Sequence, residues 1–226
     1  MSSNSKILII GAGGAGTDAL CVAQRMLAAG TATFAGFHGF ADDNPVLAGT
    51  AIDGIPVLGT VAHVLRAFDG GDRLFHCAVG ANQPRQKLAL LLEAQGWQPV
   101  SLIDPSAIVA ASARIGAGTY VGPLSFVAPQ ARVGRHVLVN VSASLGHHSQ
   151  CGDFTQVCPG GRISGYARLG EGVLVGSNGV VAPGVAIGEW ATVGAASLAV
   201  RDVAARTLAM GVPARLLPLE RYETAD

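Results

Sequence analysis

Two adjacent histidines, His147 and His148, stand inside the most regular part of the sequence. The ordinary pKa of histidine is about 6.5, so a neutral imidazole can accept a proton near physiological pH and act as a general base. Histidines are also common on ordinary surfaces, and their role depends on how the surrounding chain presents them. The remaining histidines have no partner pattern and are interpreted as structural or surface residues: His38, His63, His76 and His136.

A glycine-rich turn is the second stretch that could do chemistry. The apolar run Lys6–Ile10 is followed by the sequence G-A-G-G-A-G at residues 11–16 and by a helix-compatible segment over 17–29. Backbone amides at the N-terminus of such a helix can receive a phosphate. Small residues also let a helix pack closely on a sheet, so the motif alone leaves both interpretations open.

The acidic pair Asp42–Asp43 follows a second strand expected over residues 33–37. An acid at this point can hold a ribose hydroxyl, and a solvated turn is the equally compatible alternative. A helix near 60–68, a strand over 73–79 and a helix from about 80 to 95 continue an α/β pattern, which predicts a small Rossmann-like parallel sheet over residues 1–102. There is room for only about four strands, which argues against a complete two-halved dehydrogenase fold.

The histidine pair itself belongs to a repeat of six residues. One position in six is aliphatic over sixteen hexads from Ile103 to Val193, with Cys151 as the departure, and a small residue follows four positions later. This period favours short strands separated by turns, as in a parallel β-helix over residues 103–226. Proline recurs at the third position and marks a corner, so His147, which is third in its hexad, should point outward.

The composition excludes several classes of function. The chain has 226 residues, 50% hydrophobic and 13% charged, with 15 basic and 15 acidic side chains. This balance indicates no nucleic-acid partner and no membrane surface, and the apolar segment after Lys6 is too short to be a signal peptide or a transmembrane helix. The four cysteines lack metal-ligand spacing, so no metal site and a reduced, cytoplasmic chain are expected.

The order of the motifs resembles a known family over nearly the whole chain. After the glycine-rich turn and the acidic pair come I-P-V-L-G at 55–59, the turn Gly80-x-Asn82-x-x-Arg85, and D-P-S-A at 104–107 leading into the hexads. This arrangement is similar to the NeuD/PglD-like sugar acetyltransferases, which belong to the hexapeptide-repeat acyltransferases. The resemblance implies a left-handed β-helix with three hexads per coil, a homotrimer with active sites between subunits, and acetyl-CoA as co-substrate.

The resemblance also assigns candidate residues. His147 corresponds to the family's general base, within an N-x(6)-H motif that starts at Asn140, but His148 stands where the family usually has an acid. Advancing one coil from His147 reaches Gly165, whose missing side chain would leave a channel for the pantetheine arm, and backbone amides near it would stabilise the oxyanion. Two further departures are Ala15 and Gln156, both at positions where the family often has histidine. The candidates for the nucleotide-linked sugar are Gly11, Gly13, Gly14, Asp42, Asp43, Gly80, Asn82 and Asn140, and those for acetyl-CoA are Gly165, Gly194, Ala195, Pro213 and Arg215.

The C-terminal segment from Gly211 to Arg215 matches the family's G-x-P-A-[KR] motif, which approaches the CoA nucleotide, although any solenoid also needs a cap. Arg201, Arg206 and Arg215 are candidates for CoA phosphates or are solvated surface charges. We therefore expect a cytoplasmic, acetyl-CoA-dependent N-acetyltransferase that acts on a nucleotide-linked amino sugar in glycan biosynthesis. The alternatives are O-acetylation of a sugar of the sialic-acid type and a catalytically impaired trimer that binds a nucleotide sugar.

Overall fold

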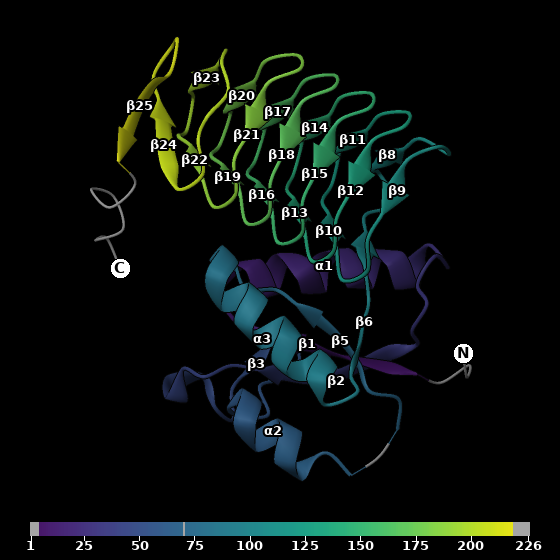
Figure 1. Cartoon of the computed structure of the whole chain (residues 1–226). Coiled ribbons are helices and arrows are strands. Elements are labelled where there is room, and N and C mark those ends of the chain that lie inside the picture. Colours follow the sequence, from purple (N-terminus) through teal and green to yellow (C-terminus); the bar gives the residue numbers. More distant parts are fainter. Residues whose placement is uncertain (1–4, 70, 219–226) are drawn as a thin grey trace. The chain divides into compact units, whose positions relative to one another are not determined.

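The computed structural model describes residues 5–69 and 71–218, and the chain divides into two compact units between Pro105 and Ser106 (Figure 1). The first is an α/β unit and the second is a parallel β-solenoid of about six turns. This confirms the predicted fold class, a small parallel sheet with helices followed by a parallel β-helix. No helix among the described residues is long and apolar enough to cross a membrane.

The first unit is built on a four-stranded parallel sheet in the order β2-β1-β5-β6. Its core strand is β1, in which every residue from Ile7 to Ile10 is fully buried. The strands of this sheet are β1 (Lys6–Ile10), β2 (Gly36–Ala41), β5 (Leu74–Cys77) and β6 (Gln98–Pro99). The other elements of the unit are α1 (Gly14–Ala28), η1 (Pro45–Leu47), the antiparallel pair β3 (Ala51–Ile52) and β4 (Ile55–Pro56), α2 (Val61–Ala67), α3 (Asn82–Ala94) and β7 (Leu102–Ile103).

The second strand lies further along the chain than expected. The prediction of a strand over 33–37 is wrong, because β2 begins at Gly36 and runs to Ala41. Phe34 is instead buried before the strand, and pairing with β1 starts where Gly36 meets Lys6. As a result, Asp42 follows the carboxyl end of β2 directly.

A buried carboxylate joins helix α1 to the end of the first unit. The Nε of Arg25 lies 2.6 Å from Oδ2 of Asp104, and Nη2 donates to Oδ1 at 3.1 Å. The hydrogen bond and charge of Asp104, whose side chain is fully buried, raise the pKa of Arg25. A two-bond pair of this kind fixes direction as well as distance, so it holds Asp104 against α1 within the first unit.

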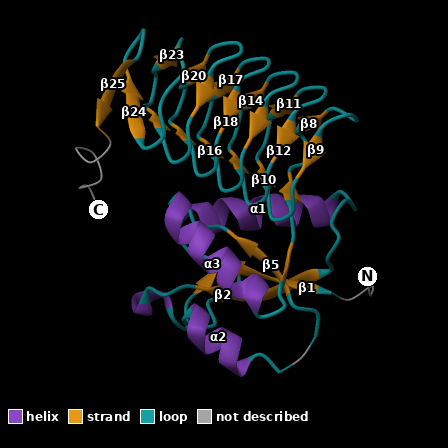
Figure 2. Cartoon of the chain, viewed as in Figure 1, coloured by secondary structure: helices purple, strands orange, loops and turns teal. Residues whose placement is uncertain are grey.

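The solenoid consists of two-residue strands that pair in parallel with the strands 18 residues before and after them, as Phe126 pairs with Ser144. Figure 2 shows these short strands, joined by turns, stacked in successive coils. The six-stranded sheet contains β8 (Ile108–Val109), β11 (Phe126–Val127), β14 (Ser144–Leu145), β17 (Arg162–Ile163), β20 (Val180–Val181) and β23 (Leu198–Ala199). The five-stranded sheet contains β9 (Arg114–Ile115), β12 (Arg132–Val133), β15 (Gln150–Cys151), β18 (Arg168–Leu169) and β21 (Ala186–Ile187). A third sheet includes β10 (Tyr120–Val121), β13 (Leu138–Val139), β16 (Gln156–Val157), β19 (Leu174–Val175), β22 (Thr192–Val193), β24 (Thr207–Met210) and β25 (Arg215–Pro218).

The interior of the solenoid follows the repeat. The aliphatic position of every hexad from Val121 to Val193 is buried, and Cys151 fills the same place. Hydroxyl groups at the small inward position donate to backbone carbonyls of the next coil, as Thr119 Oγ1 does to Gly134 at 2.9 Å. The narrow interior therefore accepts small polar side chains where the backbone supplies an acceptor.

The turns of the solenoid have a left-handed backbone conformation that their residue types do not indicate. Every sixth residue from Gly118 to Ala196 has a positive φ, yet only four of these residues are glycine, at 118, 160, 172 and 184. The others include His148 (φ 60°) and Tyr166 (φ 62°). This is the fourth residue of each hexad, one position after the third residue that the proline pattern marks as a corner. A non-glycine residue pays roughly 1–3 kcal/mol for such a conformation, which the hydrogen bonds between coils offset.

Candidate functional site

His147 follows strand β14 and lies at an exposed corner of the solenoid. The residues at this corner on successive coils are Pro129, His147, Gly165 and Pro183, here called the His147 corner. The amide of Tyr166 donates to the carbonyl of His147 at 3.0 Å, and the amide of Gly184 donates to that of Gly165 at 3.0 Å. These bonds fix His147 and Gly165 in neighbouring coils.

The ring of His147 lies over Gly165, in the space that a side chain at this position would occupy. A Cβ added at Gly165 would lie 2.7 Å from both Cε1 and Nε2 of His147, so the ring edge that carries Nε2 covers the glycine. The amide N–H of Gly165 donates to no other described residue. The ring of a candidate proton acceptor therefore covers a residue whose backbone donor is free, and acyl transfer requires a proton acceptor and a donor to the oxyanion.

Two rings, those of His148 and Tyr166, lie beside His147 on the side of its other nitrogen. Its Nδ1 lies 3.3 Å from Nδ1 of His148, within hydrogen-bonding distance when one of them carries the proton. The rings of His148 and Tyr166 are stacked, with centroids 4.7 Å apart and an interplanar angle of 15°. Tyr166 also meets His147 edge-on at 5.1 Å. Apart from its position 18 residues after His148, nothing in the residue pattern pointed to Tyr166.

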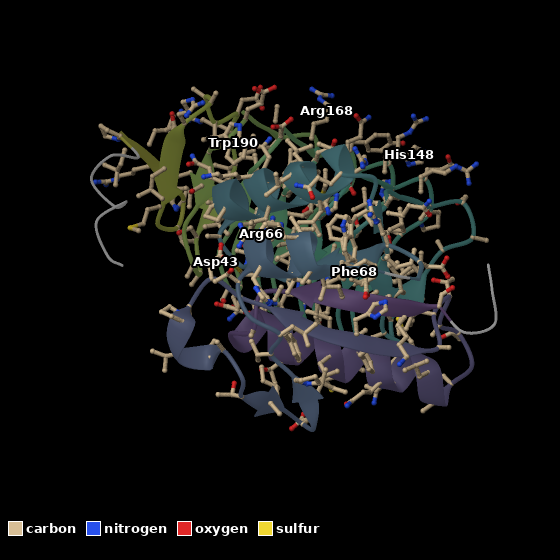
Figure 3. All side chains as sticks on the ribbon, turned by 90° about the horizontal axis from the view of Figure 1, so that it is seen from below. Asp43, Arg66, Phe68, His148, Arg168 and Trp190 are labelled. Atoms are coloured by element: carbon tan, nitrogen blue, oxygen red, sulfur yellow. The ribbon has the colours of Figure 1, made fainter. Side chains whose placement is uncertain are left out.

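His148 and Arg168, both labelled in Figure 3, lie at the outer surface of the solenoid, in agreement with their exposure. Arg168 also lines a surface cavity of about 550 Å³ over the five-stranded sheet. The same cavity is also lined by Asp202, Ala204 and Ala205. In the sequence, these three residues lie between the arginine candidates Arg201 and Arg206. His147 is not among the residues that line it.

The second group of candidates occupies a different corner. Asn140 follows β13 and Gly194 follows β22, and each is the second residue of its hexad. Both lie at the corner whose third-position residues on successive coils are Val141, Pro159, Ser177 and Ala195. We call this the Ala195 corner. The Oδ1 of Asn140 accepts from the amide of Val141 at 2.7 Å, and its carbonyl accepts from Ser125 Oγ at 2.8 Å. One strand separates the two corners, so within one chain the structure does not bring Asn140, Gly194 or Ala195 to His147.

The C-terminal motif closes one sheet of the solenoid. The amide of Leu198 donates to the carbonyl of Gly211 at 2.9 Å, and the amide of Ala214 donates back to Leu198 at 2.8 Å. Pro213 and Arg215 are exposed on this segment. The backbone thus acts as a cap and leaves both side chains facing solvent.

The glycines of the first turn divide into two kinds. A Cβ at Gly16 would lie 2.1 Å from the carbonyl oxygen of Gly11, so Gly16 is required for close packing of α1. Gly11 has φ +96° and is required by the turn. Gly13 and Gly14 are exposed, and a Cβ on either would meet nothing within 4 Å. No side chain caps α1, so the first amides of this 15-residue helix have no side-chain acceptor, an arrangement suited to an anion.

The acidic pair supports this turn. Oδ2 of Asp42 accepts from the amide of Ala12 at 2.6 Å, and its Oδ1 accepts from the amide of Asn44 at 2.8 Å. Oδ1 of Asp43 accepts from the amide of Val61, the first residue of α2, at 2.9 Å. Both carboxylates are therefore bonded to backbone, and neither belongs to a purely solvated turn.

Arg85 belongs to the turn motif seen in the sequence, and the structure shows what its side chain does. It is fully buried, and Nη1 donates to the carbonyls of Val79 and Gly80 at 2.9 and 3.0 Å while Nη2 donates to Oδ1 of Asn82 at 2.9 Å. The guanidinium thus holds the loop that carries the candidates Gly80 and Asn82. The spacing Gly80-x-Asn82-x-x-Arg85 was the available signal in the sequence.

No group of three or more histidine, cysteine or acidic side chains in the described part of the chain is arranged to hold a metal ion. All four cysteines are free thiols.

Comparisons with known proteins show similarity to sugar acetyltransferases. The model of the PglD N-terminal domain matches residues 6–92. The chain is 26% identical over 146 residues to a GDP-perosamine N-acetyltransferase of Escherichia coli, a match that spans 65% of this chain and 64% of the relative's length.

Solved structures extend the similarity to nearly the whole chain. A mutant of perosamine N-acetyltransferase from Caulobacter crescentus, in complex with CoA and GDP-perosamine, is 28% identical with a TM-score of 0.84, covering 94% of this chain and 97% of that one. The acetyltransferase domain of PglB from Neisseria gonorrhoeae, in complex with acetyl coenzyme A, is 29% identical with a TM-score of 0.82, covering 95% and 100%.

Proposed function

We propose that the chain is a NeuD/PglD-like sugar acetyltransferase, and more specifically an acetyl-CoA-dependent N-acetyltransferase that acts on the amino group of a nucleotide-linked amino sugar. The observation that carries the proposal is the exposed His147 ring over Gly165, with Nε2 beside a free amide and Nδ1 engaged by His148. The relatives' substrates support the choice of an amine as acceptor.

In the proposed reaction the amine nitrogen attacks the carbonyl carbon of the acetyl thioester. The C–N bond forms, the C–S bond breaks, and CoA leaves as the thiolate while the acetyl group stays on the sugar nitrogen. His147 Nε2 takes the proton that the amine must lose, and the amide of Gly165 donates to the oxyanion that develops on the carbonyl oxygen. Transfer is direct, with no covalent enzyme intermediate.

The first unit would hold the nucleotide. The open amides around Gly13 and Gly14 suit a diphosphate, because the N-terminus of α1 lacks any capping side chain. Asp42 holds the glycine turn in position through Ala12, and Arg85 does the same for the loop of Asn82. Asp43 and Gly80 complete the set of proposed substrate contacts.

A homotrimer is part of the proposal, because the two candidate corners lie on opposite sides of the six-stranded sheet. The outer face of that sheet carries exposed apolar side chains, with Ile108 65% and Phe126 42% exposed. If three copies pack this face around a threefold axis, the His147 corner of one copy meets the Ala195 corner of the next. Asn140, Gly194 and Ala195 would then join His147 and Gly165 across the subunit junction, and Pro213 and Arg215 would approach the CoA nucleotide.

Two alternatives remain within the same scaffold. His148 supplies no negative charge, so His147 could be too weak a base for efficient transfer, which would leave a trimer that binds a nucleotide sugar without turnover. Transfer to a sugar hydroxyl is the other alternative. A cytoplasmic location is also part of the proposal.

Thiol release from acetyl-CoA, measured with UDP-, GDP- and dTDP-linked amino sugars and with free sialic acid, tests the proposal. We expect release with a nucleotide-linked amino sugar and a loss of about 10²- to 10⁴-fold in kcat for His147→Ala, the usual contribution of a general base. His148→Asp should retain or raise kcat. Release with hydroxyl acceptors alone, or full activity of His147→Ala, would overturn the assignment.

A further inference from the structure

Tyr166 is an exposed aromatic residue whose conformation the core does not explain. It is 55% exposed and has φ 62°, a conformation that costs free energy for a residue with a side chain. Its ring nevertheless has a defined place, stacked on His148 at 4.7 Å and edge-on to His147 at 5.1 Å. The stack arises because both residues are fourth in their hexads, one coil apart.

We propose that Tyr166 is a positioning residue that holds the ring of His148 against His147, so that a histidine orients the base where a carboxylate would otherwise do so. The inference rests on the proposed function, because it names how the base of that same site is set. Stacked at 15°, the Tyr166 ring restricts rotation of the His148 ring and keeps the two Nδ1 atoms 3.3 Å apart.

The contact has a chemical consequence for the base. When Nδ1 of His147 carries a proton and donates it to the lone pair on Nδ1 of His148, Nε2 of His147 is left unprotonated and can accept the proton of the amine. The imidazolium that forms keeps its Nδ1–H bonded to His148, and the face and edge of Tyr166 lie against both rings.

Few charged side chains lie on the elements around His147, His148 and Tyr166. The positions equivalent to His148 and Tyr166 on the coils before and after are Gln130 and Gly184, which carry no charge. The strand after the corner presents Arg132 and Arg168 on neighbouring coils, and the strand before it presents Arg162, whose Nη1 donates to Ser144 Oγ at 3.2 Å. None of these groups is an acid, so the positioning of His147 does not fall to a carboxylate on these elements.

A second stack in the solenoid gives a useful contrast. His136 and Phe154, also fourth in their hexads and one coil apart, stack with centroids 5.3 Å apart and an interplanar angle of 4°. Phe154 is 4% exposed and belongs to the core, whereas Tyr166 is mostly exposed and lies beside His147. The repeat can therefore build the stack at more than one corner, and only the His148 stack reaches the candidate base.

A double-mutant cycle tests the inference. Tyr166→Asn removes the ring and keeps a residue that tolerates this conformation, since Asn178 already adopts φ 55° at an equivalent position. An aromatic stack is worth about 0.5–1.5 kcal/mol, so kcat should fall about two- to tenfold while KM for acetyl-CoA changes little. Tyr166→Phe should rescue kcat, and in a His148→Asp background Tyr166→Asn should cost nothing, because a carboxylate needs no stacking partner.

A spectrum of ¹⁵N-labelled histidine provides a readout that does not depend on turnover. The wild type should show His147 with its proton on Nδ1, and Tyr166→Asn should show both tautomers. The inference is overturned if Tyr166→Asn changes neither kcat nor the spectrum, or if its cost is the same in the His148→Asp background. A wild type that releases no thiol with any acceptor would refute the proposed function instead, and the tautomer measurement would still decide the role of Tyr166.

Discussion

Replacing Gly165 with alanine is expected to displace the His147 ring without damaging the fold. The added Cβ would lie 2.7 Å from Cε1 and Nε2, whereas ordinary contacts begin at 3.4 Å, so the ring must retreat by about 0.7 Å. The clashing atoms belong to an exposed side chain that can turn away. Displacement of a catalytic group by about 1 Å can cost about 100-fold, so we expect kcat/KM to fall about 10- to 100-fold.

Gly146→Ala is the matched control, because its Cβ would meet backbone instead. It would lie 2.5 Å from the amide nitrogen of Gly165 and 2.7 Å from the carbonyl carbon of Ser164. Coils cannot separate locally, so we expect overpacking of about 1–3 kcal/mol and a Tm lowered by about 2–12 °C. Gly165→Ala should instead change Tm by less than about 2 °C.

The assay combines thiol release from acetyl-CoA with thermal unfolding followed by intrinsic fluorescence. Activity of Gly165→Ala within about twofold of wild type would refute the idea that the observed position of the His147 ring matters for transfer. A Tm drop as large as that of Gly146→Ala would show that the activity loss reports unfolding rather than displacement of the ring.

Two further predictions concern the first unit and the buried thiols. Asp42→Ala removes the acceptor for the amide of Ala12 and should lower the free energy of unfolding by about 1–3 kcal/mol. It should also weaken nucleotide-sugar binding measured by isothermal titration calorimetry. The control Asp18→Ala, at an exposed position, should have neither effect. Burial raises the pKa of the Cys77 and Cys151 thiols from 9.0 to about 12, so the unfolded thiols ionise first and the free energy of unfolding should fall between pH 9 and 12. Urea titrations across that range should show a smaller decline for Cys151→Ala, and an equal decline would contradict the assignment to this thiol.

The hexads allowed the solenoid and the outward position of His147 to be predicted from local pattern. A period of six sends the same position inward in each hexad, so one aliphatic residue in six determines which face is buried. The α/β unit was predicted with less accurate boundaries, because the segment from Phe34 to Ala41 lacks a clear alternation that would show where pairing with β1 begins.

The left-handed turns were missed for a different reason. Glycine marks such turns when it is present, but His136, Phe154 and Trp190 adopt the same conformation, and their residue types give no sign of it. The cost is met by hydrogen bonds between coils, such as the bond from the amide of Phe154 to the carbonyl of Arg135 at 2.9 Å. Those bonds exist only when the coils are stacked.

The sequence by itself determined the repeat, the fold class, the glycine-rich turn and the candidacy of His147, because each depends on residue types at short, regular spacing. The tertiary structure decided which side chains meet: Tyr166 on His148, the His147 ring over Gly165, and the separation of the Ala195 corner from the His147 corner. Contacts between residues 18 apart depend on coil register and on side-chain rotamers. Neither is visible in residue types alone, and both are set when successive coils stack.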